Sequence, residues 1–201
     1  MAEEANFENT IFYLLGPPGV GKLTVGQHLA DMTRARLVHN HLWLNPIFSL
    51  IEQDGVTPLP KDVWTPVSQV RRAVFETLRT LTPISWNLIF THAAVGKKND
   101  ADMEVANDII GVAESRGAQL IIVQMTCAAE VLAERVAMPE RRLLFKENDV
   151  DAARLNALRE PFHPGHPDTI AIDTTNLSAK ATAHRILLLA EKRRQSGQLL
   201  G

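Results

Sequence analysis

A glycine-rich stretch near the amino terminus, Gly16-Pro17-Pro18-Gly19-Val20-Gly21-Lys22-Leu23-Thr24, constrains the fold more than any other part of the chain. It follows a continuously apolar run, 11–15, and it opens a helical pattern over 22–33. Glycines allow successive backbone N–H groups to converge on one anion, because a Cβ atom would block the turn or the anion. The helix directs its positive end into the same space, and Lys22 adds a full positive charge. The sequence therefore predicts a strand, a phosphate-binding loop (P-loop) and a helix, in that order.

One position departs from the usual motif. The residue after the lysine normally carries a hydroxyl group that ligates Mg²⁺, but here it is Leu23 and the hydroxyl comes one residue later, on Thr24. This arrangement resembles the Gly-Lys-Gly-Thr loop of nucleoside-monophosphate kinases. The resemblance implies that Thr24 contacts phosphate and holds Mg²⁺ mainly through water. The alternative is an ordinary Gly/Pro turn before a helix.

Composition narrows the class of protein. The 201 residues fit one α/β domain, and the net charge of −2 gives no general attraction to nucleic acid or to an anionic membrane. No apolar run approaches the ~20 residues of a membrane helix. The single cysteine, Cys127, excludes an intramolecular disulfide, and the acidic amino terminus lacks the basic start of a secretory signal. We therefore expect a cytoplasmic protein.

Five apolar runs, at 10–15, 36–39, 87–91, 119–125 and 169–173, alternate with helical patterns. This alternation predicts an α/β fold with a parallel sheet and helices on both faces. Ligands of such sheets bind beyond the carboxyl ends of the strands. That rule directs attention to the P-loop and to four further groups: His39-Asn40-His41, Thr91-His92, Thr126-Cys127 and Thr174-Thr175-Asn176.

With these features in order, the chain resembles the P-loop kinases of the nucleotide kinase, shikimate kinase and chloramphenicol phosphotransferase-like group. The resemblance covers nearly the whole chain, and Gly16 to Thr24 is its specific part. It implies one three-layer P-loop NTPase domain over 1–201, with about five parallel strands, an acceptor-binding region at about 40–85 and a helical lid at about 137–160. It also implies the cofactors ATP and Mg²⁺ and the transfer of the γ-phosphate to a hydroxyl or phosphate group of a small molecule. The oligomeric state stays open.

The region between the fourth and fifth strands is rich in cations: Arg135, Arg141, Arg142, Lys146, Arg154 and Arg159. Phosphoryl transfer needs position and positive charge around the migrating group, and a basic lid supplies both while excluding water. The resemblance implies that Arg135 lies near the base or phosphates of the nucleotide, with Arg141 or Arg142 on the transferred phosphate. It also places Asn176 in the nucleotide site. A solvated helix face, with these cations paired to nearby carboxylates, is the alternative.

The acceptor region departs from the family pattern. An Asp commonly follows the second strand in these kinases, whereas this chain has His41 there as the candidate base, with a structural or substrate-binding histidine as the alternative. An acid is also missing after the third strand, which leaves Asp100, Asp102 and Asp173 as carboxylates for a Mg²⁺-bound water. Further candidates for acceptor binding are His39, His92, Arg71 and Arg72, with Trp43, Phe48, Trp64 and Phe75 as walls or as core residues.

Other functions remain open. The two missing acids favour a regulatory nucleotide-binding protein or a slow NTPase without an acceptor, whereas the basic lid favours a kinase. His39, His41 and His92 could instead form a metal site. A toxin-like kinase that acts on a cell-wall precursor or on RNA is a further alternative. A relative of the AAA+ ATPases fits poorly, because no Asp-Glu pair follows the third strand and the chain is too short for their helical domain.

Overall fold

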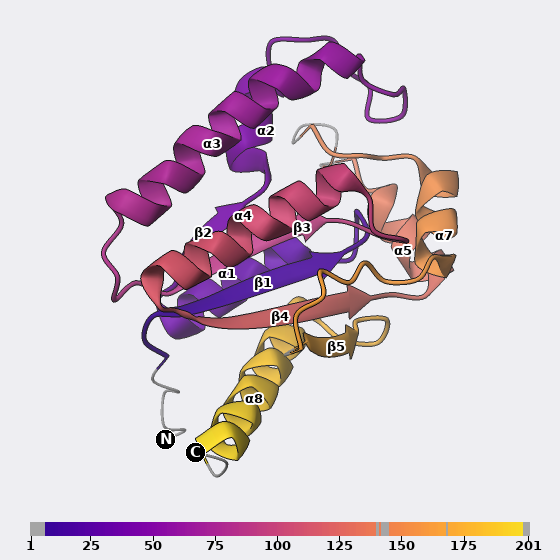
Figure 1. Cartoon of the computed structure of the whole chain (residues 1–201). Coiled ribbons are helices and arrows are strands. Elements are labelled where there is room, and N and C mark those ends of the chain that lie inside the picture. The colour runs from indigo at the N-terminus through magenta and orange to yellow at the C-terminus, as the bar shows by residue number, and fades with distance from the viewer. Residues whose placement is uncertain (1–6, 140, 142–144, 168, 199–201) are drawn as a thin grey trace.

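A computed structural model describes residues 7–139, 141, 145–167 and 169–198. Five strands form one all-parallel sheet in the order β2-β3-β1-β4-β5 (Figure 1). The strands are β1 (Thr10–Gly16), β2 (Arg36–His39), β3 (Leu88–Ala93), β4 (Gln119–Thr126) and β5 (Thr169–Asp173). The predicted α/β class, strand number and parallel direction are confirmed.

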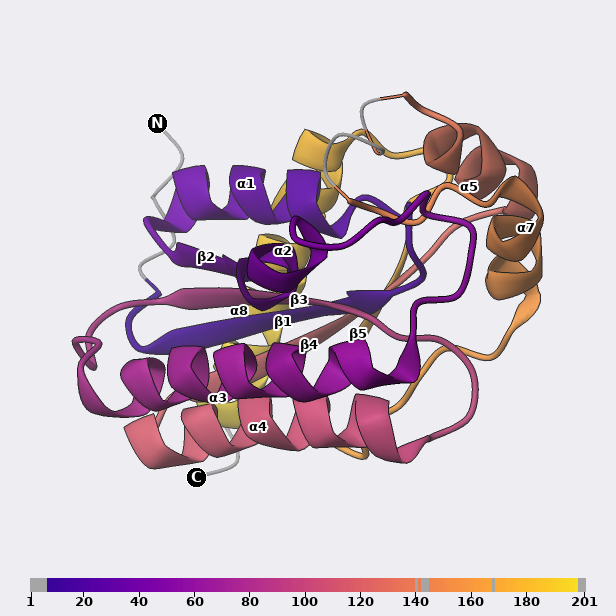
Figure 2. The same cartoon turned by 90° about the horizontal axis from the view of Figure 1, so that it is seen from above.

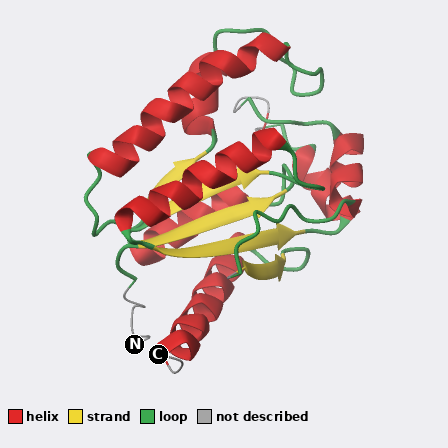
Figure 3. Ribbon diagram, viewed as in Figure 1, coloured by secondary structure: helices red, strands yellow, loops and turns green. Residues whose placement is uncertain are grey.

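Helices cover both faces of this sheet, so that the strands form the middle of three layers (Figure 3). Figure 2 shows α1 on one side of the sheet and α3 with α4 on the other. The helices are α1 (Lys22–Thr33), α2 (His41–Phe48), α3 (Trp64–Thr80), α4 (Asp100–Arg116), α5 (Ala129–Val136), α7 (Val150–Leu158) and α8 (Ala179–Gln198), with a short 3₁₀ turn at Lys61–Val63. None of the helices in this described part of the chain has the length and apolar character needed to cross a lipid bilayer.

The central strand β1 explains why the sequence needs both layers. Its residues are buried on both faces, and successive side chains point to opposite sides. Phe12 and Leu14 join a core with α1, α5 and α8, whereas Tyr13 and Leu15 join a second core with α2, α3 and α4. The buried β1 thus fixes the position of the P-loop that follows it.

One buried arginine secures the layer formed by α3 and α4. Arg116, at the end of α4, is only 4% exposed. Its guanidinium donates hydrogen bonds of 2.7–3.2 Å to five backbone carbonyl oxygens at and beyond the end of α3, those of Leu78, Thr82, Pro83, Ile84 and Trp86. Arg116 therefore ties the turn between α3 and β3 to α4.

Candidate functional site

The P-loop conformation depends on its glycines. Gly16 and Gly19 have φ angles of +147° and +88°, which side chains rarely adopt. A Cβ atom on Gly16 would lie 2.3 Å from the carbonyl oxygen of Met125 in β4, and one on Gly19 would lie 2.4 Å from Cγ2 of Val136 in α5. The loop therefore runs against its neighbours at distances that only glycine allows.

The side chain of Lys22 is buried within the loop. Its Nζ donates hydrogen bonds of 2.7 Å to the carbonyl oxygens of Gly16 and Pro17. Burial, together with the positive charges of Arg141 and Lys146, lowers the pKa of Lys22 to about 7. An anion in the loop would relieve both effects, because it supplies negative charge to the amine and to the lid cations.

This shifted pKa predicts a pH effect on nucleotide binding. At pH 8 Lys22 is mostly neutral in the free protein and charged beside a triphosphate, so binding of Mg·ATP takes up about one proton, whereas at pH 6 it takes up little. Calorimetry in buffers of different ionisation enthalpy measures this uptake. Lys22→Met should remove it. An equal uptake in Lys22→Met would show that another group titrates.

The lowered pKa of Lys22 also makes the free energy of unfolding depend on pH. Because the pKa of Lys22 is lower in the folded protein than the ordinary 10.5, the folded state disfavours the charged amine. The effect of Lys22 on the free energy of unfolding is therefore most favourable above pH 10.5, where the amine is neutral in both states. The free energy of unfolding decreases as the pH falls from 10.5 toward 7.

A cavity of about 1190 Å³ lies at the carboxyl ends of the strands. Residues 18–25 of the P-loop line one part of it, including the exposed side chain of Thr24. The ends of β2 and β3, α2, the start of α4 and the lid residues line the rest. A single cavity therefore joins the P-loop, the predicted acceptor region and the basic lid.

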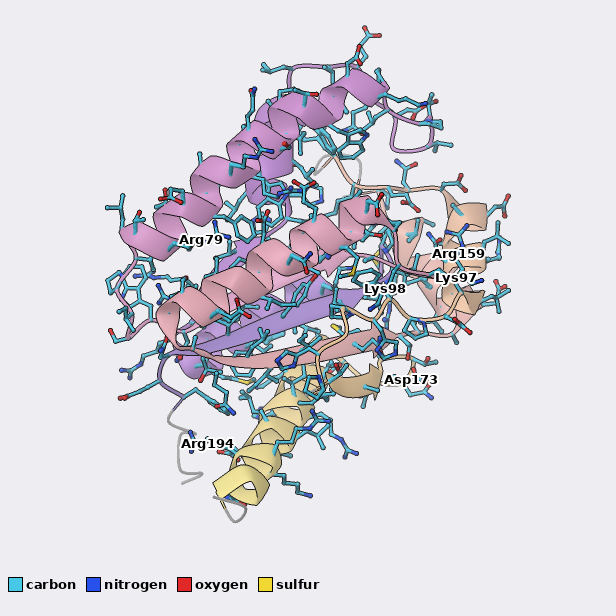
Figure 4. All side chains as sticks on the ribbon, viewed as in Figure 1. Arg79, Lys97, Lys98, Arg159, Asp173 and Arg194 are labelled. Carbon is cyan, nitrogen blue, oxygen red and sulfur yellow. The ribbon has the colours of Figure 1, made fainter. Side chains whose placement is uncertain are left out.

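The lid cations divide into two groups. Arg135, Arg141, Lys146 and Arg159 line the cavity, and Figure 4 shows Arg159 beside α7. Arg154 instead pairs with Glu130 and Asp151 at a side chain 43% exposed, so for Arg154 the solvated-face interpretation is correct. Arg142 lies outside the described residues.

Two of the cavity cations are held by backbone groups. Arg135 donates to Oγ1 of Thr174 at 3.1 Å and to its carbonyl oxygen at 3.0 Å, which fixes the guanidinium at the end of β5. Arg141 donates through Nε and Nη2 to the carbonyl oxygen of Glu147 at 2.9 and 2.6 Å. Burial lowers the pKa of both Arg141 and Lys146. These contacts hold the guanidinium groups of Arg135 and Arg141 beside the cavity.

The segment predicted to be a lid touches the predicted acceptor-binding region directly. The backbone N–H of Asn148 donates to the carbonyl oxygen of Gly55 at 3.0 Å, and its Nδ2 donates to that of Asp54 at 2.9 Å. Gly55 has a φ angle of +77°, and a Cβ atom there would lie 2.7 Å from the Asn148 amide. This contact, between segments far apart in the sequence, bounds the cavity on one side.

The histidines after β2 are neutral groups of the cavity wall. His41 begins α2, and its Nδ1 forms a 2.7 Å hydrogen bond with Oδ1 of Asn45. Burial lowers the pKa of His41 to about 4, and the positive charges of Lys146 and Arg141 add to the effect. Burial also lowers the pKa of His39. The buried Nδ1 of His39 has no hydrogen-bond partner among the described residues.

His92 of β3 belongs to a buried chain of hydrogen bonds. The hydroxyl of Tyr13 lies 2.6 Å from His92 Nδ1, and His92 Nε2 lies 3.1 Å from Oδ1 of Asp102. Asp102 lines the cavity, as does His92, whereas Asp100 and Asp173 do not. Figure 4 places Asp173 at β5. No group of three or more His, Cys, Asp and Glu side chains in the described part of the chain could hold a metal ion, so the three-histidine site has no support.

Arg71 and Arg72, the two arginines predicted to bind an anionic acceptor, lie in different places. Arg71 lines the cavity but already forms ion pairs with Glu104 at 2.5 Å and Asp108 at 3.1 Å, both in α4. Arg72 is exposed on α3 and lies outside the cavity lining. Asn176, predicted for the nucleotide, is likewise exposed and outside the lining. The roles of these three residues stay predictions.

The four aromatic candidates differ in whether they line the cavity. Trp43, Phe48 and Trp64 line the cavity, although Trp43 and Phe48 are also buried core residues, and their role as acceptor walls stays a prediction. Phe75 is fully buried and stacks on Phe90 with ring centroids 5.5 Å apart, so the core interpretation is correct for it. Thr174 accepts a hydrogen bond from Arg135 and lines the cavity. The sequence pattern placed Thr174 at the end of a strand but did not predict its contact with Arg135.

Several solved structures that resemble this fold are described as kinases. A candidate kinase of Chloroflexus aurantiacus matches with a TM-score of 0.64 at 18% identity, covering 94% of this chain and 97% of its own. A gluconokinase of Sinorhizobium meliloti matches at 0.59 and 18% identity, covering 98% and 99%. An APS kinase of Mycobacterium tuberculosis, in complex with AMPPNP and APS, matches at 0.54 and 13% identity, covering 92% and 98%.

No protein-family profile matches the chain, and no curated protein is similar to it in sequence. At such low identities the structural likeness establishes the fold alone. The chain has the three-layer α/β fold of the P-loop kinases.

Proposed function

We propose that this protein transfers the γ-phosphate of ATP to a hydroxyl or phosphate group of a small molecule in the cytoplasm. The observation that carries the proposal is the single cavity, which the P-loop, the lid cations and the acceptor region line together. Phosphoryl transfer requires donor, acceptor and positive charge in one water-poor space. The kinase folds of the structural neighbours support the same assignment.

The nucleotide is expected on the P-loop, with its β and γ phosphates on the backbone N–H groups of 18–24 and on Lys22. Thr24 offers its hydroxyl to this part of the cavity, which fits a Mg²⁺ ion held mainly through water. When bound, the ion neutralises charge on the phosphates. Arg135, Arg141 and Lys146 close the site from the lid side and stabilise charge on the transferred group.

The acceptor is expected beside α2 and α3. Trp43, Phe48 and Trp64 supply apolar surface, and His39, at the end of β2, lines the same part of the cavity. Because Asn45 occupies Nδ1 of His41, its Nε2 is left for a ligand. These walls fit a small molecule that combines an apolar part with a hydroxyl group.

His41→Ala should therefore slow transfer about tenfold and leave the affinity for Mg·ATP within about threefold, because the side chain contacts the acceptor and not the phosphates. Steady-state kinetics with each substrate varied in turn, together with calorimetry of Mg·ATP binding, test this. Normal turnover in His41→Ala would remove its assigned role.

A regulatory nucleotide-binding protein is the second candidate. Residues 39–51 contain no carboxylate, so the base that these kinases commonly place after the second strand is missing at that position. ADP release separates the two functions. It is measured with water alone and with a panel of small hydroxyl and phosphate compounds, and mass spectrometry shows whether a compound gained a phosphoryl group. Stimulation by one compound supports the kinase, and equal release in every well supports the regulator.

A further inference from the structure

The proposed transfer needs a group that orients the acceptor hydroxyl and takes its proton. His41 stands where that group is expected, but it is poorly suited to become charged. Burial opposes a charge on its ring, and Lys146 and Arg141 already place positive charge nearby. A proton on His41 would add a further cation to this cluster. A group that becomes neutral on accepting a proton fits the site better.

Asp102 is such a group. It lies in the first turn of α4, lines the cavity and keeps 23% of its side chain exposed. Burial raises the pKa of Asp102, but hydrogen bonds from His92 and Asn99 outweigh this and hold the pKa below its ordinary value. The side chain is therefore an ionised carboxylate at neutral pH.

Three hydrogen bonds fix its orientation. His92 Nε2 lies 3.1 Å from Oδ1, and Asn99 Nδ2 donates to Oδ2 at 2.6 Å, while Oδ1 of Asn99 accepts from the Asp102 backbone N–H at 2.9 Å. Each carboxylate oxygen retains a free lone pair for a ligand. The carboxylate is thus restrained but not saturated.

Asp102 and Tyr13 together define the tautomer of His92. The ionised Asp102 can only accept, so His92 Nε2 donates to it. Burial raises the pKa of Tyr13 well above its ordinary value, so its hydroxyl keeps its proton and can donate to His92 Nδ1. The pKa of His92 is lowered, chiefly by burial, so the ring is neutral and its one proton sits on Nε2, facing Asp102. The hydrogen bond with Tyr13 thus leaves the N–H group at Nε2 of His92 to donate to the Asp102 carboxylate.

The strand register places this chain of groups beside the P-loop. His92 in β3 pairs with Leu15 in β1, the residue before Gly16. The charges of Lys22 and Arg71 both act on His92, one from the phosphate side and one from the acceptor side. Asp102, bonded to His92, lines the same cavity as the P-loop and the predicted acceptor region.

We propose that Asp102, held by His92 and Tyr13, orients the acceptor hydroxyl and takes its proton during transfer. The acceptor oxygen forms a bond to the γ-phosphorus of ATP, the bond from that phosphorus to the bridging oxygen breaks, and ADP leaves. The hydroxyl proton passes to Asp102 and then to water. This role rests on the proposed kinase function, and His92 and Tyr13 act in it as positioning residues.

The charge of the nucleotide favours this role. A bound triphosphate raises the pKa of a nearby carboxylate, which makes Asp102 a better proton acceptor in the complex than in the free protein. Because the transition state of phosphoryl transfer is loose, a modest base suffices, and its position matters most.

Asp102→Asn tests the role, since it keeps the shape and removes the base. We expect kcat to fall by 10²–10³-fold with the stimulating compound, with the affinity for Mg·ATP and the Mg²⁺ requirement unchanged within about threefold. In Asp102→Ala, which leaves space in place of the carboxylate, formate should restore part of the lost rate. The matched control is Glu114→Gln, an exposed carboxylate at the far end of the same helix, which should behave as wild type.

Each other outcome has a defined meaning. Wild-type kcat in Asp102→Asn overturns the proposal. A raised Mg²⁺ requirement with kcat recovered at high Mg²⁺ also overturns it and shows that Asp102 holds a metal-bound water. If the wild-type protein phosphorylates no compound and its ADP release is unaffected by Asp102→Asn, the proposed function itself fails.

The positioning residues have a separate readout. His92→Gln can accept from Tyr13 and donate to Asp102, whereas His92→Leu can do neither. We expect kcat to fall at least tenfold further in His92→Leu than in His92→Gln. Nitrogen NMR of the wild-type ring should show the proton of His92 on Nε2, and a proton on Nδ1 would contradict the proposed chain.

Discussion

Lys22→Ala should reduce phosphoryl transfer by about 10³-fold or more, the largest effect on activity that we expect from one substitution. The lysine amine supplies a full charge to the transferred phosphate in a buried site, where electrostatic stabilisation is strong. Its Nζ already lies in the loop, held by the carbonyl oxygens of Gly16 and Pro17. Calorimetry measures the affinity for Mg·ATP and ADP release measures turnover, so that a loss of binding can be distinguished from a loss of transfer.

Replacement of Lys22 by an apolar residue should leave the fold intact. Because burial lowers the pKa of Lys22 to about 7, the charged amine is costly in the free protein, and Lys22→Met should unfold at the same temperature or a higher one. The control is Lys180→Met, an exposed lysine of α8, which should change neither activity nor stability. Turnover within tenfold of wild type in Lys22→Ala would argue against phosphate binding by the loop.

Arg116→Met should produce the largest loss of stability, about 3 kcal/mol in the free energy of unfolding. The substitution leaves the buried carbonyl oxygen of Leu78, and part-buried ones beyond the end of α3, without their charged donor. Urea unfolding followed by circular dichroism measures the loss. Activity per folded molecule should stay near that of wild type, because Arg116 lies outside the cavity lining.

Arg72→Met is the matched comparison for stability. Its side chain is exposed on α3, and its loss should change the free energy of unfolding by less than about 0.5 kcal/mol. If Arg116→Met were equally neutral, the five contacts of the guanidinium would contribute nothing to folding, and our interpretation of this turn would be wrong.

The parts of the fold that depend on local sequence could be predicted. Apolar runs bounded by Gly, Pro and polar residues identify the five strands, because strands buried on both faces are continuously apolar. The P-loop could be predicted for the same reason, since strand, glycines, lysine and helix are contiguous. The position of the cavity then follows from the parallel sheet.

The contacts that depend on strand order could not be predicted. Tyr13 and His92 meet because β1 lies beside β3, although 79 positions separate them. Nothing near Tyr13 in the sequence indicates this pairing. The sequence left Asp102 as one of three carboxylates for a metal-bound water, and only the fold sets it apart from the other two.

Side-chain partners on neighbouring helices were equally hidden. The sequence offers Arg71 as an anion contact, but the packing of α3 on α4 gives it Glu104 and Asp108 as partners. The five carbonyl contacts of Arg116 also arise from this packing. Charge pairing between helices depends on how they are packed, and periodicity within each helix does not determine that.

A crystal structure with Mg²⁺ and AMPPNP tests the central claim most directly. We predict that the β and γ phosphates lie on the backbone N–H groups of 18–24, with Lys22 Nζ turned from its own loop onto the γ-phosphate. The γ-phosphate should face the part of the cavity that His41 and Asp102 line. A nucleotide bound elsewhere, or a loop whose carbonyl oxygens keep Lys22 in the complex, would contradict the account.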